Sequence, residues 1–204
     1  MKNYFVSGIG TNIGKTICSA ILVEFLKADY WKPIQSGDLD NSDSQKIKEL
    51  ISNTQTQIFP ERYLLTQSLS PHAAAEIDKV SIHLDDFILP TTNNDLIMEG
   101  AGGLMVPINK KGDLIIDLIQ HIKAEVILVS QNYLGSINHT LLSLEILKNR
   151  NIPIKGILFN GEPKKSTEDI ILEIGGARNL GRIDFTEFVN KSFVRSQGEN
   201  LNWD

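Results

Sequence analysis

The stretch GIGTNIGKT, residues 8–16, decides the fold of this chain. It follows a short apolar run, Tyr4 to Val6, and opens a segment with helical periodicity that extends to Lys27. A glycine-rich turn that leads into a helix N-terminus presents several backbone N–H groups to one point, as a chain of phosphates requires. Lys15 adds a charge toward the terminal phosphates, and the Thr16 hydroxyl is placed to bind Mg²⁺. The sequence therefore predicts a phosphate-binding loop and a nucleoside triphosphate as ligand.

The spacing of this loop departs from the common pattern by one residue. Five residues separate Gly8 from Gly14, whereas the usual motif has four at the same place. An ordinary helix cap is the alternative explanation for Gly-Lys-Thr. The order of strand, loop and helix favours the phosphate loop.

Composition limits the classes of function. A chain of 204 residues fits one α/β domain, and we predict a single domain over residues 1–204. The net charge of −5 argues against a nucleic-acid or membrane partner, because there is no basic surplus. The single cysteine, Cys18, lies among apolar residues and is expected to be a buried thiol. The longest aliphatic run, Val126 to Val129, is too short to span a bilayer, and we expect a cytoplasmic protein.

Continuous apolar runs predict a mostly parallel sheet. Strands covered by helices on both faces show unbroken rather than alternating hydrophobicity. Weaker candidates for strands are Trp31 to Gln35 and Asn179 to Ile183. The main strands are expected at Tyr4 to Val6, Leu96 to Met98, Val126 to Val129 and Ile154 to Phe159.

Helical periodicity recurs between these runs, and it predicts a P-loop NTPase-type α/β fold with a central sheet flanked by helices. Ser42 and Gln45 form a capping-box pattern at the start of the second helix. The polar stretch 53–71 is expected to be irregular structure over the binding edge. The expected helices are Lys15 to Lys27, Asp43 to Ile51, Leu114 to Ile122, Asn138 to Lys148 and Thr167 to Ile174.

Polar motifs follow the predicted strands, where ligands bind in open parallel sheets. In LIMEGAGG, residues 96–103, Glu99 ends a buried strand and can hold Mg²⁺, directly or through water. Three glycines follow within four positions, and they let the backbone approach phosphate or substrate. The plainer alternative is a strand-ending acid before a flexible turn. The phosphate loop favours the role of Glu99 as a metal ligand, because the loop independently predicts a bound Mg²⁺.

Three further motifs are candidates for the same site. In KPIQSG, Lys32 at a strand end could neutralise charge during phosphoryl transfer, although most lysines are simply exposed. Asp43 lies in the first turn of a helix, where the helix dipole favours a carboxylate with or without a metal. His72 in the sequence SPH could contribute to the site or be a loop histidine, and both options stay open.

The stretch LGSINH, residues 134–139, introduces a helix after the strand that ends at Ser130. Its free N–H groups predict an anion site that would suit a substrate carboxylate. Ser136 as an ordinary helix cap is a competing explanation, and the two are compatible.

Taken together, the phosphate loop, KPIQSG, NSD, SPH, EGAGG and LG-x-INH occur in the order seen in dethiobiotin synthetases, and the chain resembles that family from about Tyr4 to Asn160. The family joins the two amines of 7,8-diaminononanoate with CO₂ into a ureido ring, and consumes ATP with Mg²⁺, as a step of biotin synthesis. The resemblance implies a carbamate, then a mixed carbamic-phosphoric anhydride, then ring closure by the second amine.

The resemblance also implies residue roles. Lys15 and Lys32 would flank the reacting groups as catalytic residues, and Thr16, Asp43 and Glu99 would organise Mg²⁺. The implied ATP contacts are Asn12, Ile13, Gly14, Lys15, Thr16, Ile17, Asp43, Glu99, Gly100, Ala101, Gly102 and, as the adenine reader, Asn160. The implied substrate contacts are Thr11 at the diamine, Ser36 at the carbamate, and Gly135, Ser136, Ile137 and Asn138 from the partner subunit of a homodimer.

The chain departs from the family pattern in three places. Asn12 stands where many members have Glu, so an acid role there is lost. The short connection from Ala28 to Trp31 is expected to shorten the following strand. The sequence LGRID, residues 180–184, resembles the base-binding loop but lacks its proline. Whether residues 182–184 recognise adenine or accept another nucleotide base therefore stays open.

Two other classes of protein share parts of this pattern. Chromosome-partitioning ATPase switches usually carry an extra lysine at the start of the loop, where this chain has Gly8 to Gly10. They also commonly have a basic surface or a membrane-binding helix. Cobyrinate amidases need a glutaminase domain with a catalytic cysteine, and only Cys18 is present. Both alternatives are therefore disfavoured.

Overall fold

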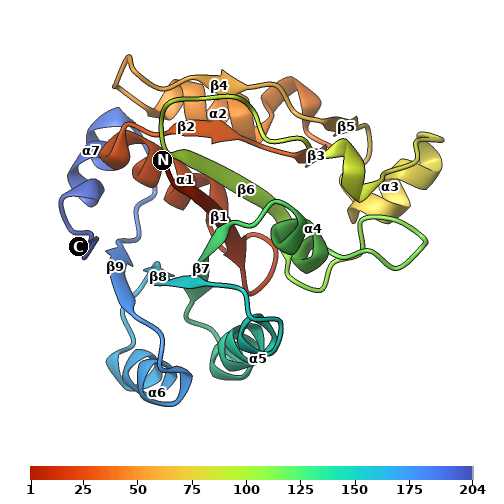
Figure 1. Cartoon of the computed structure of the whole chain (residues 1–204). Coiled ribbons are helices and arrows are strands. Elements are labelled where there is room, and N and C mark those ends of the chain that lie inside the picture. The colour runs from red at the N-terminus through yellow and green to blue at the C-terminus, as the bar shows by residue number, and fades with distance from the viewer. Residues whose placement is uncertain (204) are drawn as a thin grey trace.

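A seven-stranded sheet in the order β4-β2-β6-β1-β7-β8-β9 forms the centre of the protein. This computed structural model describes residues 1–203 (Figure 1). Every neighbouring pair in the sheet is parallel. This architecture confirms the predicted α/β class with a mostly parallel sheet. The strands are β1 (Asn3–Gly8), β2 (Asp29–Trp31), β4 (Ile58–Phe59), β6 (Leu96–Gly103), β7 (Glu125–Gln131), β8 (Ile154–Asn160) and β9 (Asn179–Ile183).

Helices cover both faces of the sheet, which explains the unbroken apolar runs. Phe5 and Met98 lie opposite each other in register and share one core cluster, whereas their neighbours Tyr4 and Ile97 belong to a second cluster on the other face. Helices α1, α2 and α7 pack on the second face, and α3 to α6 cover the first (Figure 1). The helices are α1 (Lys15–Leu26), α2 (Asp43–Leu50), α3 (Pro71–Ile77), α4 (Ile115–His121), α5 (Ser136–Asn149), α6 (Lys165–Gly175) and α7 (Lys191–Gly198).

The predicted strand from Trp31 to Gln35 is wrong, because the structure breaks it into two. Strand β2 ends at Trp31, and β3 (Ile34–Ser36) leaves the main sheet to pair with β5 (Tyr63–Leu65). Pro33 lies at the break, where it has no N–H for a sheet ladder. The expected connection from Ala28 to Trp31 is itself mostly strand, because Asp29–Trp31 form β2.

The glycines after Glu99 continue the strand, which was predicted to end at Glu99, and the alternative of a flexible turn is wrong. Strand β6 continues through Gly103, so Glu99 lies within the strand and not at its end. A Cβ at Gly100 would lie 2.7 Å from the Phe5 ring, which shows that β1 packs where a side chain would be. Small residues therefore let β1 and β6 stay in contact up to the binding edge.

Other elements were only partly predicted. The stretch 53–71 is not irregular throughout, since it contains β4 and β5 and ends where α3 begins. Helices α3 and α7 were not predicted, because seven and eight residues are too few to show a helical period. Helix α5 begins at Ser136 instead of Asn138. Cys18 is fully buried as expected, and burial raises the pKa of its thiol. None of the helices in residues 1–203 is both long and apolar enough to cross a membrane.

The capping box at the start of α2 is confirmed. The Gln45 N–H donates to the Ser42 hydroxyl at 3.3 Å, and the Ser42 N–H donates to the Gln45 side chain at 2.8 Å. The start of α5 differs, because Gly135 is its N-cap with a φ of 105°, and no side chain caps it. Ser136 as the cap of α5 is therefore wrong.

We expect Ser42→Ala to lower the free energy of unfolding by about 1 kcal/mol, since the Gln45 N–H in the first turn of α2 loses its acceptor. For a protein of this size the melting temperature should fall by about 2–4 °C. Ser44→Ala is the matched control, because Ser44 lies in the same turn and its hydroxyl has no hydrogen-bond partner among residues 1–203. Equal melting temperatures for the two variants would contradict the capping argument. Calorimetric unfolding measures both.

Candidate functional site

A cavity of about 720 Å³ lies where the phosphate loop, β3, the first turn of α2 and β6 meet. Segment 68–71 closes a further side of it. Most of the predicted site residues lie on its wall, whereas their roles stay predictions. The predicted site residues that line the cavity are Thr11, Asn12, Gly14, Lys15, Thr16, Ile17, Lys32, Ser36, Asp43, Glu99, Gly100, Ala101 and Gly102.

The phosphate loop adopts a conformation that requires its last glycine. Gly14 has a φ of 86° and caps α1, and a Cβ there would lie 2.2 Å from the Asn160 amide nitrogen. Lys15 folds back so that its Nζ donates to the Gly10 carbonyl at 3.0 Å. Burial lowers the pKa of Lys15, and the attraction of Glu99 offsets this only in part. The Lys15 charge therefore lacks full compensation, which favours the approach of an anion.

Lys32 is buried between two carboxylates. Its Nζ lies 2.6 Å from an Asp43 oxygen and 3.2 Å from a Glu99 oxygen, and it donates to the Gly100 carbonyl at 3.1 Å. Only 4% of Lys32 is exposed, so the surface-lysine alternative is wrong. Burial alone would lower the pKa of Lys32, but Glu99 and Asp43 outweigh it and raise the pKa. In the same way, burial opposes the ionised form of Asp43, but Lys32 reverses this and lowers the pKa of Asp43.

Thr16 brings the two carboxylates to the phosphate loop. Its hydroxyl lies 3.1 Å from Asp43 Oδ1 and 2.8 Å from Glu99 Oε1. These are hard oxygen donors of the kind that suits Mg²⁺. Among residues 1–203, no group of three or more His, Cys, Asp and Glu side chains gathers to hold a metal. A cation held by this trio would therefore need phosphate oxygens to complete its coordination.

Several residues at or beside the site were not predicted. Gln35 accepts a hydrogen bond from the Asp43 N–H at 3.2 Å, and Tyr30 donates to Glu99 at 2.9 Å. Lys46 pairs with Asp38 at 2.7 Å, and both line the cavity. Lys46 is three residues from Asp43 on one helix, a spacing that could have placed it on the same face. No sequence signal identified Tyr30, because an aromatic residue in a strand is ordinarily a core residue.

Some predicted nucleotide contacts lie outside the cavity. Asn160 donates from its side chain to the Ile13 carbonyl at 2.8 Å, so it contacts the phosphate loop from the side of β8. Arg182 forms an ion pair with Glu168 and donates to the Gly161 carbonyl at 2.8 Å. The predicted base reader therefore lies next to the loop, and Arg182 of the atypical segment is already engaged.

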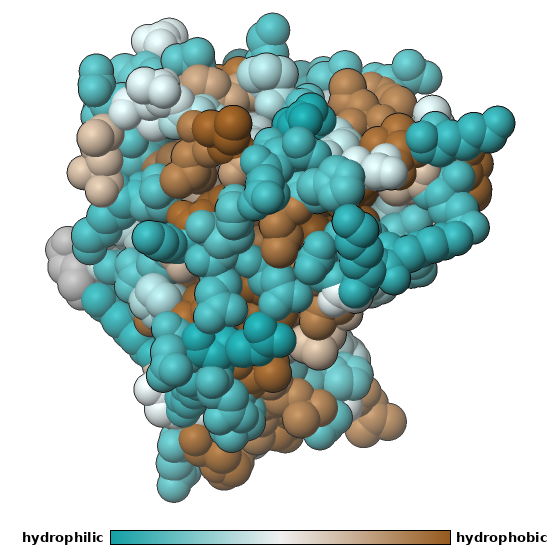
Figure 2. Space-filling model, turned by 45° about the vertical axis from the view of Figure 1, so that its right-hand side comes forward, coloured by the Kyte–Doolittle hydropathy of each residue, from teal (hydrophilic) through white to brown (hydrophobic). Residues whose placement is uncertain are grey.

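The predicted substrate segment 135–138 does not line the cavity of its own chain. It forms the N-terminus of α5, beside the fully exposed Leu134. The Ser136 hydroxyl is buried and has no partner among the described residues. Apolar side chains gather at the lower end of Figure 2, the level at which Figure 1 shows α5 and α6.

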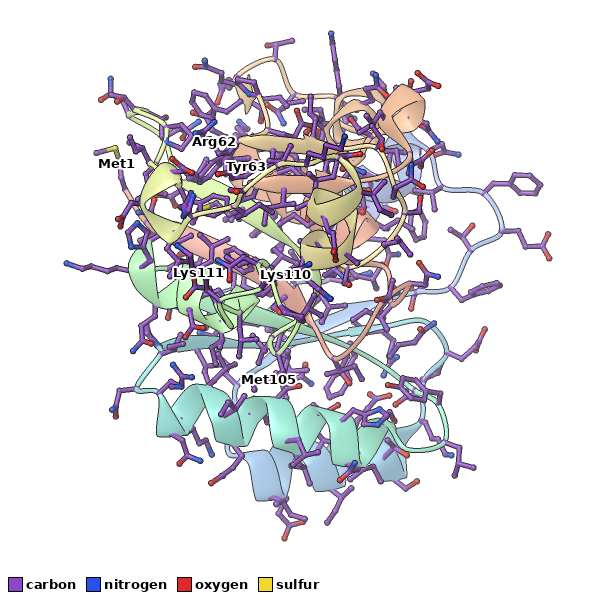
Figure 3. The ribbon with its side chains drawn as sticks, turned by 90° about the vertical axis from the view of Figure 1, so that its right-hand side faces the viewer. Met1, Arg62, Tyr63, Met105, Lys110 and Lys111 are labelled. Atoms are coloured by element: carbon purple, nitrogen blue, oxygen red, sulfur yellow. The ribbon has the colours of Figure 1, made fainter. Side chains whose placement is uncertain are left out.

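His72 lines a second cavity, of about 330 Å³, rather than the first. Ser70 and Pro71 line the first cavity, and the Ser70 hydroxyl lies 3.0 Å from His72 Nδ1. Lys110 and Lys111, which Figure 3 labels, line the second cavity. Lys110 forms an ion pair with Glu76. The SPH motif therefore contributes its first two residues to the main site.

Comparison with known proteins assigns the family. A family model described as an AAA domain matches residues 2–192. The ATP-dependent dethiobiotin synthetase BioD of Christiangramia forsetii is 50% identical, over 98% of this chain and 96% of its own. This chain belongs to the dethiobiotin synthetase family. The synthetase BioD of Cytophaga hutchinsonii is likewise 50% identical, over 100% of this chain and 99% of its own. As a member of this family the protein is an ATP-dependent ligase of biotin biosynthesis.

Solved structures show that the family shares its fold with partition ATPases. A putative plasmid partition protein from Borrelia burgdorferi bound to AMPPNP has a TM-score of 0.61 at 14% identity, covering 98% of this chain and 95% of its own. The cell-division ATPase MinD of Pyrococcus furiosus has a TM-score of 0.59 at 14% identity, covering 98% of both chains. At this identity the likeness concerns architecture alone, whereas the synthetase relatives decide the family.

Proposed function

We propose that this protein closes the ureido ring of dethiobiotin from 7,8-diaminononanoate, CO₂ and ATP, with Mg²⁺. The observation that carries the proposal is the convergence of Lys15, Lys32, Thr16, Asp43 and Glu99 on one cavity. The sequence is 50% identical to two dethiobiotin synthetases over nearly its whole length. Residues 1–204 would act as one cytoplasmic domain, a range that extends one residue beyond the described part.

The phosphate side of the site would hold ATP. Backbone N–H groups of residues 12–17 and the Lys15 ammonium would bind the phosphates. Thr16, Asp43 and Glu99 would hold Mg²⁺, which supplies positive charge beside the β- and γ-phosphates. Lys32, already next to both carboxylates, would neutralise charge that develops on the transferred phosphoryl group. Asn160, Gly100, Ala101 and Gly102 would complete the nucleotide contacts.

The reaction needs no side-chain nucleophile. An uncharged amine of the substrate attacks CO₂ to give a carbamate, and a carbamate oxygen attacks the γ-phosphorus as ADP leaves. The second amine then attacks the carbonyl carbon of this carbamic-phosphoric anhydride, closes the ring and expels phosphate. Positioning and charge neutralisation are therefore the tasks of the protein.

Two wall residues would contact the substrate. The Ser36 hydroxyl is buried and has no partner among residues 1–203, so it is free to hydrogen-bond the carbamate. Thr11 is exposed at the mouth of the cavity and would contact the diamine region.

A second copy of the chain would complete the site. Residues Gly135 to Asn138 form a helix N-terminus that suits a carboxylate, yet they lie outside the cavity of their own chain. Leu134 is fully exposed and Ile137 is 37% exposed, as expected for residues that a partner covers. We therefore propose a homodimer in which one subunit receives the substrate carboxylate of the other.

An assay with labelled bicarbonate tests the function. Protein supplied with the diamine, Mg²⁺ and ATP is expected to fix the label into an acid-stable product and to release one phosphate per label. Omission of the diamine is the control, and it should stop both signals. Phosphate release at the same rate without the diamine would instead indicate an ATPase switch.

A further inference from the structure

A buried tyrosine binds the Glu99 oxygen that faces away from the phosphate loop. Tyr30 on β2 is fully buried, and its hydroxyl donates to Glu99 Oε2 at 2.9 Å. Glu99 itself is 1% exposed. Tyr30 lies opposite Ile97 in the parallel register, and Glu99 is two residues further along β6. Since residues two apart in a strand share a face, the pairing of β2 with β6 brings the tyrosine to the carboxylate.

The two oxygens of Glu99 are divided between different partners. Oε1 is within hydrogen-bonding distance of Thr16 and Lys32, at 2.8 and 3.2 Å, whereas Tyr30 binds Oε2. The last torsion of a glutamate is broad, so its neighbours must set the orientation of the carboxylate. The Tyr30 hydroxyl is the partner that holds Oε2 in this buried position.

We propose that Tyr30 is a positioning residue that fixes the Glu99 carboxylate, so that Oε1 faces Thr16 and the Mg²⁺ of the nucleotide complex. The inference rests on the proposed metal role of Glu99. Tyr30 does not touch substrate or nucleotide, and it acts through Glu99. Partners that orient a metal ligand typically change metal affinity by about 10–100-fold when they are removed.

The test compares Tyr30→Phe with Tyr4→Phe. Tyr4 is 1% exposed, also lies opposite Ile97 from the other side of β6, and packs its ring against Trp203. Both substitutions remove one hydroxyl from the same core cluster. Binding of AMPPNP is measured by calorimetry over a Mg²⁺ titration and again in EDTA. Tyr30→Phe is expected to raise the half-saturating Mg²⁺ concentration by about tenfold, with the affinity in EDTA unchanged. Tyr4→Phe should match the wild type in both.

The outcomes separate this inference from the proposed function. A wild-type affinity that does not depend on Mg²⁺ would remove the metal site and with it the role of Tyr30. A Mg²⁺-dependent wild type with the same half-saturation in Tyr30→Phe would overturn the role of Tyr30 alone. Equal losses of affinity with Mg²⁺ and with EDTA would also overturn it, because they indicate an effect on the fold.

A measurement on the unsubstituted core covers the case in which Tyr30→Phe does not fold. Protein labelled with 3-fluorotyrosine carries four signals, one for each tyrosine. The Tyr30 signal is assigned by elimination with Tyr4→Phe, Tyr63→Phe and Tyr133→Phe. It is expected to shift when Mg²⁺ is added to the AMPPNP complex, because Glu99 is then shared with the cation. A Tyr30 signal that does not respond to Mg²⁺ would overturn the proposal.

Discussion

Lys32→Met is expected to lower kcat by about 10²–10³-fold, with a smaller change in ATP affinity. The Lys32 charge is fully desolvated beside the phosphate loop, where fixed charge stabilises a transition state more than it would in water. Steady-state kinetics with the labelled-carbon assay, together with calorimetric ATP binding, separate the two effects. An unchanged kcat would remove Lys32 from the mechanism.

The same substitution should also destabilise the protein without ligand. Asp43 and Glu99 would be left without their shared cation, and breaking a buried ion pair from one side costs about 3–5 kcal/mol. Lys46→Met is the matched control, because Lys46 also lies in the cavity, but its side chain is 33% exposed and pairs mainly with the exposed Asp38. Its removal should cost about 1 kcal/mol or less. Denaturant unfolding at neutral pH compares the two variants.

In Lys32→Met, the contribution of Asp43 to the pH dependence of stability should have the opposite sign to that in the wild type. In the wild type the lowered pKa means that the contribution of Asp43 is present above pH 3.8 and is lost as pH falls through the lowered value. Without Lys32, burial favours the protonated acid and raises its pKa. The stability of the variant should therefore rise as the pH falls through that raised value, and the gain should be complete below pH 3.8. Unfolding free energies across the acidic range test this, and parallel curves for the two proteins would contradict the pairing.

Lys15→Ala is expected to abolish turnover and to weaken ATP binding, yet to leave stability unchanged. Lys15 makes one hydrogen bond, to the Gly10 carbonyl, and burial disfavours its charge. The free protein therefore gains little from this charge, whereas the bound triphosphate would gain a direct partner. We expect a loss of at least about 10³-fold in kcat/KM, of the order found for groups that stabilise phosphoryl transfer.

The control for Lys15→Ala is Lys48→Ala, which removes an exposed lysine from the last turn of α2. It should keep full activity. A Lys15→Ala protein with wild-type turnover would contradict the phosphate-loop assignment. Lys15→Ala should keep the wild-type melting temperature, whereas Lys32→Met should lower it, although each substitution removes one positive charge from the same cavity.

The capping box and the phosphate loop could be predicted because their determinants are local. Ser42 and Gln45 satisfy each other within one turn, and the glycines of the loop precede the helix that they serve. The long apolar runs gave the central strands for a similar reason. A strand buried on both faces shows its environment in its own composition.

The extension of β6 through Gly103 was not predicted, because the conformation of this glycine run depends on a neighbouring strand. In isolation, three glycines within four positions resemble a turn. The packing of β1 against β6, with Phe5 at the place of the missing Gly100 side chain, makes them strand. The break at Pro33 has a comparable origin, since β3 pairs with β5 instead of continuing β2.

By itself, the sequence determined the family, the phosphate loop, the central strands and the identity of most residues around the cavity. Only the tertiary structure decided that Lys32 is buried between Asp43 and Glu99, and that Tyr30 binds the second oxygen of Glu99. Lys32 and Glu99 are 67 positions apart in the sequence, and Tyr30 and Glu99 are 69 positions apart. Burial and charge pairing arise from contacts between strands, so no local pattern of residues can encode them, whereas turns and helix starts are determined within a few residues.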